Sequence, residues 1–171
     1  YAAEHFDAVL QLWYPGSEGG KAAAQVLFGE VSPSGKLPVT FYESLEELPE
    51  FTDYRMEGRT YRYMKGKAQY PFGYGLTYGN VSVTGAEIAA RPDGSIVVSA
   101  EAENTGVETD EVLQVYVENT DCSRAGKHPE LCGFLRIHLK EGQKACFEIP
   151  VSKDVFTVVG EDGVREEKGT H

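Results

Sequence analysis

Apolar and polar residues follow two different patterns, which change near residue 80. From residue 81 onward short segments alternate apolar and polar side chains, most clearly in Val112-Leu-Gln-Val-Tyr-Val117 and Phe134-Leu-Arg-Ile-His-Leu139. Turn-forming strings such as Pro92-Asp-Gly94 and Asn104-Thr-Gly106 separate these segments. A period of two with regular turns is typical of half-buried antiparallel strands. We therefore expect a β-sandwich over residues 81–171 that lacks its last strand, with strands at residues 81–88, 95–103, 111–118, 133–139, 145–151 and 155–159.

The first 42 residues place an alanine-rich segment between two apolar runs. Residues 7–14 and 37–41 are short and apolar, as expected for buried parallel strands. Residues 21–28 between them are rich in helix formers, and we expect a helix that begins at Ser17 or Glu18 and ends at Gly29. One such βαβ unit leaves its sheet edges unpaired. The pattern therefore predicts that residues 1–42 are the C-terminal part of a larger α/β sandwich domain.

Residues 43–80 have little periodicity and are dense in Tyr, Gly, Pro and Arg. A long irregular segment is unusual in a compact protein unless its side chains hold it in place. Aromatic side chains bury large areas, so we expect an ordered, aromatic-rich connector between two domains. Residues 70–78 combine glycines with the bulky Phe72, Tyr74 and Tyr78, and we expect this string to pack between the domains.

Charge and cysteine content restrict the class of partner. The formal net charge is −11, and an acidic chain repels phosphate groups, so nucleic acid and anionic membranes are poor partners. The apolar runs are too short to cross a bilayer, and the first residues do not form a signal peptide, although an upstream one could have been lost. Three cysteines at irregular spacing do not suggest a disulfide framework. Reduced thiols favour the cytoplasm, and secretion stays open.

Several strings together resemble the C-terminal half of family 3 glycoside hydrolases, the β-glucosidase and β-xylosidase group. Two lie in the first domain, at Trp13-Tyr-Pro-Gly-Ser-Glu-Gly-Gly20 and Pro33-Ser-Gly-Lys-Leu-Pro-Val-Thr-Phe41. Two more lie in the connector, at Gly58-Arg-Thr-Tyr-Arg-Tyr63 and Tyr70-Pro-Phe-Gly-Tyr-Gly-Leu-Thr-Tyr78. The resemblance continues through Leu131-Cys-Gly-Phe-Leu-Arg-Ile-His-Leu139, so it spans essentially the whole chain in order.

The resemblance implies an enzyme built from a TIM-like barrel, an α/β sandwich and an immunoglobulin-like, fibronectin-III-like β-sandwich. Retaining hydrolysis of a β-glycoside needs a nucleophilic carboxylate and an acid/base carboxylate. In the family the first lies on the barrel and the second lies upstream of the segment that resembles residues 13–20. We therefore expect no catalytic residue in this chain. Its implied partners are the missing barrel and the rest of the α/β domain, or a second chain carrying them, and a β-glycoside.

Three residues are candidates for contact with sugar at the rim of the substrate cleft. Trp13, Tyr14 and Glu18 follow the first predicted strand, and ligands of α/β sheets bind at the carboxyl ends of strands. The glycines of this string lack the Gly-Lys-Ser/Thr ending of a phosphate-binding loop. A tight turn that allows the helix to pack closely on the sheet is the simpler interpretation.

Other clusters of polar residues favour structural roles. The spacing of Cys122, His128, Cys132 and His138 is unlike that of structural zinc sites, so we expect neither a metal nor another cofactor. The acidic run from Glu43 to Glu57 is typical of a solvated face. Arginines among the tyrosines of the connector are expected to stack on the rings and fix it, namely Arg55, Arg59 and Arg62.

Two functions from different classes remain open for the β-sandwich. It can brace a glycosidase, or it can be a free-standing carbohydrate-binding or scaffold module. A sugar-binding sandwich commonly exposes a row of aromatic rings, whereas residues 81–171 contain no Trp and Tyr116 is their only Tyr. The few Phe residues occupy core-like strand positions, which favours bracing. Whether the chain is a natural subunit of a split enzyme stays open, as does the choice between glucosides and xylosides.

Overall fold

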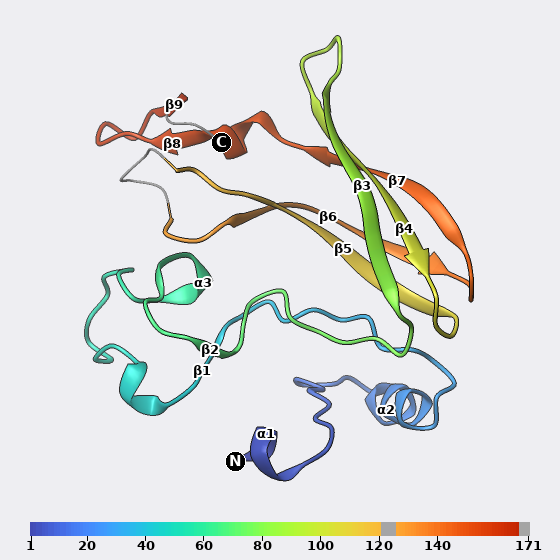
Figure 1. Cartoon of the computed structure of the whole chain (residues 1–171). Coiled ribbons are helices and arrows are strands. Elements are labelled where there is room, and N and C mark those ends of the chain that lie inside the picture. The colour runs from blue at the N-terminus through green and yellow to red at the C-terminus, as the bar shows by residue number, and fades with distance from the viewer. Residues whose placement is uncertain (121–125, 168–171) are drawn as a thin grey trace.

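The computed structural model describes residues 1–120 and 126–167. Its C-terminal half consists of antiparallel sheets (Figure 1). One sheet has the order β3-β4-β7, formed by Val81–Ala90, Ile96–Asn104 and Lys144–Val151. The other pairs β5 (Thr109–Val117) with β6 (Glu130–Leu139). The side chains that form the core come from both sheets, and they are Ala102, Leu113, Ile137, Leu139 and Ile149.

Alternation explains why these segments are strands. In β6 and β7 every second residue toward the C-terminal end is buried, and the residues between them are exposed. A side-chain period of two places one set in the core and the other in water. All six predicted strands are present, with bounds that shift by a few residues. The last is shorter than expected because Lys153–Phe156 forms a 3₁₀ turn, η2, before β8 (Thr157–Val159). A further short strand, β9 (Arg165–Glu167), pairs with β8.

The first 42 residues contain the predicted helix but not the predicted parallel strands. Helix α2 spans Gly19–Leu27, and Gly29 follows it with φ of +74°, the left-handed conformation that ends many helices. Residues 7–14 form no strand, and Trp13 has φ of +55°. Residues 37–41 join a ladder only at β1 (Phe41–Tyr42). The first four residues after Tyr1 form a short helix, α1 (Ala2–His5).

The lack of sheet neighbours among the described residues explains this difference. A parallel strand needs backbone partners alongside it and a covering layer on each face. Among the described residues none pairs with residues 7–14, and β1 pairs antiparallel with β2 (Ala68–Tyr70) instead. Leu10, Leu12 and Leu27 are consequently exposed.

The segment of residues 43–80, expected to be a connector, lies along the β5–β6 sheet (Figure 1). It contains the 3₁₀ turn η1 (Leu45–Glu47), the short helix α3 (Thr60–Tyr63) and β2. Its last part runs beside the segment that follows α2, because Leu37 donates its N–H to Tyr74 O at 2.9 Å and Gly73 donates to Leu37 O at 2.8 Å. Distant parts of the sequence therefore meet on one side of the sandwich. In the part of the chain that the structure describes, no helix is long and apolar enough to cross a membrane.

Candidate functional site

The three predicted rim residues lie on the surface at the start of α2. The Trp13 ring lies 6.3 Å from the Phe41 ring, while Tyr14 is fully exposed. Glu18 precedes α2 and approaches Lys21 Nζ to 3.9 Å, with both side chains exposed. Sugar contact at these residues stays a prediction.

The most developed site is a junction where the first 80 residues meet the β5–β6 sheet. At its centre three hydroxyl groups meet: Ser32 from the segment after α2, Thr77 from the connector and Thr109 from the start of β5. Thr109 donates to Ser32 Oγ at 2.6 Å, Ser32 and Thr77 share a hydrogen bond of 2.8 Å, and Thr77 also contacts Thr109. Thr109 is buried, so these groups have little access to water as an alternative partner. Each hydroxyl can both donate and accept, which allows the cluster to satisfy itself.

Asn104, the last residue of β4, holds the next part of the junction and is completely buried at 0% exposure. Its Oδ1 accepts from Asn80 N at 3.1 Å and from Gly106 N at 3.0 Å. Its Nδ2 donates to the carbonyl groups of residues 107, 139 and 140 at 2.8, 3.2 and 3.3 Å. One amide therefore links the end of the connector to two turns of the sandwich.

A largely buried ion pair also crosses the junction. Lys36 Nζ lies 2.6 Å from Glu111 Oε1 on β5, and Lys36 also donates to Gly75 O at 2.6 Å. Glu111 Oε1 additionally accepts from Val112 N at 2.7 Å. A buried charge is tolerated when it is paired and hydrogen-bonded, as both of these are. The pair therefore holds the segment after α2, the connector and β5 together.

Two glycines of the connector let it approach this closely. A Cβ atom on Gly75 would lie 2.1 Å from Gly35 O. A Cβ on Gly73, which has φ of +80°, would meet Tyr116 Oη at 2.3 Å. Gln114 Nε2 donates to Gly73 O at 3.0 Å, so β5 contacts the connector there as well. The string 70–78 thus packs against both parts, as the sequence suggested.

Helix α3 attaches the other end of the connector to the sheet. Tyr61 stacks on Phe72 with a centroid distance of 4.1 Å, and its hydroxyl accepts from Leu131 N at 3.1 Å. The side chain of Phe72 is half-buried rather than fully enclosed. His128 Nε2 lies 2.8 Å from Met64 O. Because a carbonyl only accepts, Nε2 carries the proton in this bond.

Only one of the three connector arginines lies over a tyrosine ring. The guanidinium carbon of Arg62 lies 5.5 Å from the centre of the Tyr63 ring. Arg55 instead binds the carboxylate of Asp53, and Arg59 donates to backbone carbonyl groups. The expected stacking is therefore present for Arg62 and wrong for Arg55 and Arg59, because a neighbouring carboxylate or carbonyl group is the stronger acceptor for a guanidinium group.

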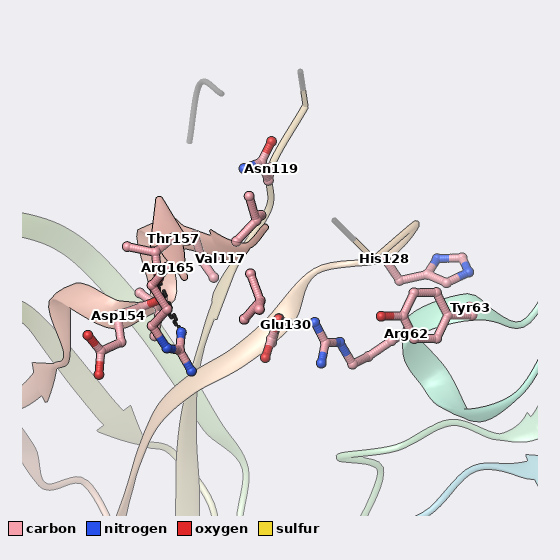
Figure 2. A pocket seen from close by; sticks show the side chains of 13 residues that line it. Arg62, Tyr63, Val117, Asn119, His128, Glu130, Asp154, Thr157 and Arg165 are labelled. Carbon is pink, nitrogen blue, oxygen red and sulfur yellow. Dashed lines mark hydrogen bonds and ion pairs between the residues drawn. The ribbon is translucent and has the colours of Figure 1, made fainter. Parts of the chain in front are cut away.

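A polar pocket lies beside α3, between the ends of β5 and β6 and the β8–β9 hairpin (Figure 2). Figure 2 shows Arg165 on one side and Arg62 on the other, with Glu130 between them. Arg62 Nη2 pairs with Glu130 Oε2 at 2.6 Å, and Arg165 Nη1 donates to Asp154 O and Thr157 Oγ1 at 3.3 and 3.1 Å. Arg62 Nη2 and Arg165 Nη1 thus have partners, while the buried Arg62 Nε has no hydrogen-bond partner among the described residues. We assign no ligand to the pocket.

The zinc alternative finds no support in the described residues. His138 binds carboxylates, with Nδ1 at 2.8 Å from Asp110 and Nε2 at 3.1 Å from Glu108. Cys132 Sγ donates to Val115 O at 3.3 Å, and burial raises the pKa of this thiol. Cys122 lies outside the described residues. Within residues 1–120 and 126–167 no group of three or more His, Cys, Asp or Glu side chains is arranged so that it could hold a metal ion.

Asp110 makes the stability of the sheet depend on pH. The hydrogen bond from His138, and then those from Arg136, hold the pKa of Asp110 below its usual value. A lowered folded-state pKa contributes stability that is present above the unfolded pKa of about 3.9 and is lost as pH falls through the folded value. We expect Asp110→Asn to unfold at lower denaturant concentration than the natural chain at pH 7 but not at pH 2. Denaturant melts across this range test it, with Glu87→Gln on β3 as the control.

One expectation about aromatic side chains is wrong. Phe134 is 68% exposed, on the outer face of β6 together with Arg136 and His138, and is not a core residue. The reason is register: Ile137 and Leu139 are buried, so the alternate positions 134, 136 and 138 must face outward. A single exposed ring does not make a sugar-binding row.

Comparison with known proteins agrees with this architecture. Residues 1–78 match the glycosyl hydrolase family 3 C-terminal domain, and residues 111–171 match the fibronectin type III-like domain. The chain therefore belongs to glycosyl hydrolase family 3, as part of its C-terminal region. The fold class expected from the sequence is confirmed at this level.

The relatives that this chain matches are longer proteins, of which it covers only a part. It is 43% identical to a xylan 1,4-β-xylosidase of Xylanibacter ruminicola over 88% of this chain and 18% of that protein. It is 35% identical to a periplasmic β-glucosidase of Salmonella typhimurium over 85% of this chain and 21% of that protein. The solved β-glucosidase of Erythrobacter marinus superposes with a TM-score of 0.80 and 31% identity, over 98% of this chain and 23% of the other. The chain thus spans about a fifth of the length of these relatives.

Proposed function

We propose that this chain is the C-terminal portion of a retaining β-glycosidase that hydrolyses β-linked glucosides or xylosides, and that it braces the enzyme without supplying a catalytic group. Membership of glycosyl hydrolase family 3 is the observation that supports this class of reaction. The named relatives include both β-xylosidases and β-glucosidases, which supports the pair of substrates without choosing between them. In this proposal residues 1–42 are the C-terminal part of the α/β sandwich domain, and residues 81–171 form the fibronectin-III-like sandwich. Residues 43–80 connect the two domains.

The junction supports the bracing role. Hydroxyl, amide and ion-pair contacts join Ser32, Lys36 and Asn80 to the sandwich, and they leave few free polar groups there. A site that binds sugar needs unsatisfied donors and acceptors aimed at the ligand. A set of mutually satisfied groups instead fixes the angle between two bodies.

Two acidic residues of the connector have partners other than a second carboxyl group. A retaining site places its two carboxyl groups about 5–5.5 Å apart across the glycosidic bond. Glu57 pairs with Lys65 at 2.7 Å, and Glu47 accepts from Glu43 N at 3.1 Å, with these side chains on the surface. The family resemblance supports placing both catalytic carboxylates in the rest of the enzyme, one on the barrel and one before the segment that resembles residues 13–20.

The isolated chain is expected to show no turnover of nitrophenyl β-glucoside or β-xyloside. The reason is that both carboxylates belong to the upstream part of the enzyme. Assays of the purified chain beside the longer enzyme test this. Turnover by the chain that persists after a second purification step and is absent from a mock preparation would contradict the proposal.

A free-standing carbohydrate-binding module is the second candidate. Phe134 is the observation that favours it, since its exposed ring offers a face for stacking on sugar. Pull-down of the chain on insoluble xylan and on cellulose, with Phe134→Ala as the matched control, separates the candidates. Retention that depends on Phe134 favours binding, and absence of retention favours bracing.

A further inference from the structure

The loop of residues 50–59 is held in one conformation by its own side chains. Arg59 donates to three backbone carbonyl groups of this loop: Glu50 O and Arg55 O, both at 3.1 Å, and Asp53 O. Asp53 and Arg55 form a two-point pair, with distances of 3.0 Å from Nε to Oδ1 and 2.8 Å from Nη2 to Oδ2. These bonds link the carbonyl groups of residues 50, 53 and 55 to one guanidinium group and tie Asp53 to Arg55.

This braced loop exposes large apolar side chains. Phe51 is 92% and Tyr54 is 88% exposed, and Met56 is exposed as well. Leu45 and Leu48, just before the loop, are exposed too. Figure 1 places the segment between η1 and α3 at the edge of the molecule, away from the sandwich. Large apolar groups exposed together mark interaction surfaces, and a rigid loop binds without first losing conformational entropy.

We infer that the loop of residues 50–59 is the docking element by which this chain binds the upstream part of the same enzyme, with Phe51 and Tyr54 as its anchors. This inference rests on the proposed function. About four fifths of the length of the named relatives lies outside this chain, so a large surface of the same polypeptide is available to cover the rings. Because Asp53, Arg55 and Arg59 bind groups within the loop, its exposed apolar side chains fit an apolar protein surface better than the hydroxyl groups of a sugar.

The net negative charge of residues 43–57 indicates which charge the partner surface carries. Residues 43–57 contain six carboxylates and one basic residue, Arg55. Electrostatic complementarity therefore predicts a surface on the upstream part with apolar pockets for the two rings and a basic rim. An acidic glycan is a poor occupant for the same reason.

The test compares the same substitutions in the isolated chain and in the longer enzyme. Phe51→Ala with Tyr54→Ala is expected to leave the unfolding temperature of the isolated chain unchanged, since both rings are exposed in it. In the longer enzyme the same pair is expected to lower that temperature by several degrees, on the order of 3–5 °C. Arg59→Gln keeps both rings but removes the brace, and it should reproduce part of this loss. Phe134→Ala serves as the control for an exposed ring on the sandwich.

The alternatives have distinct results. Unchanged unfolding temperatures in both settings would overturn the inference. A lower kcat/KM on xylo- or cello-oligosaccharides, but not on nitrophenyl glycosides, with unchanged unfolding temperatures would mean that the rings face substrate, and would overturn it as well. If the unmodified longer enzyme hydrolyses neither glycoside while the temperature difference is present, the docking stands and the proposed function fails.

Discussion

Asn104→Ala is expected to lower the free energy of unfolding of the chain by about 2–4 kcal/mol. The substitution removes two acceptor and three donor contacts from a fully buried side chain. A buried group that loses its partner costs about 1–3 kcal/mol, and here several backbone groups lose theirs at once. Denaturant melts followed by fluorescence measure the loss. Asn80→Ala is the matched control, because its exposed amide bonds only Thr105 Oγ1, and it should cost within about 0.5 kcal/mol.

Asn104→Asp distinguishes lost hydrogen bonds from lost volume. Aspartate has nearly the same shape, but its carboxylate would face three carbonyl groups where the amide donated. Burial and these acceptors should raise the folded-state pKa of the new carboxyl group above its unfolded value of about 3.9. Its destabilisation is then weakest below pH 3.9, where the group stays protonated, and grows as pH rises through the folded pKa. If Asn104→Asp lowered the free energy of unfolding equally at pH 3 and pH 7, the amide donors would contribute little.

The sandwich could be predicted from the sequence because its signal is local. Burial of one face of a strand imposes a period of two, and Leu135, Ile137 and Leu139 show it directly. The strand expected at residues 7–14 does not form, because its signal is not local. An apolar run indicates burial, but it forms a strand only when neighbouring strands pair with it, and no described residue does so.

The junction could be predicted only in outline. Glycine content indicated that residues 70–78 pack closely on other segments, which the contacts of Gly73 and Gly75 show, whereas the expected anchors Tyr74 and Tyr78 are exposed. The role of Asn104 was hidden, because Asn-Thr-Gly is also an ordinary turn signal. Ser32, Thr77 and Thr109 lie up to 77 positions apart, and no spacing rule connects them. Long-range polar contacts depend on the assembled fold, so a single sequence gives no local sign of them.

Gly75→Ala is expected to separate the connector from the segment after α2 and to lower the free energy of unfolding by about 2–3 kcal/mol, within the usual range for overpacking. The new Cβ would lie 2.1 Å from Gly35 O, and a backbone oxygen cannot rotate away as a flexible side chain can. The two segments must therefore move apart. That movement should break the bond from Lys36 Nζ to Gly75 O and expose the Leu37 and Gly73 amides.

Gly35→Ala is the matched control for this experiment, on the facing segment. A Cβ there meets nothing within 4 Å, and the backbone is not left-handed, so the change should be neutral or stabilise the chain by about 0.4–1 kcal/mol. Denaturant melts give the two free energies, and amide hydrogen exchange at Leu37 and Gly73 reports on the contact itself. If both variants lost the same stability, or if these two amides kept their protection in Gly75→Ala, the close approach of the segments would not be what holds the junction together.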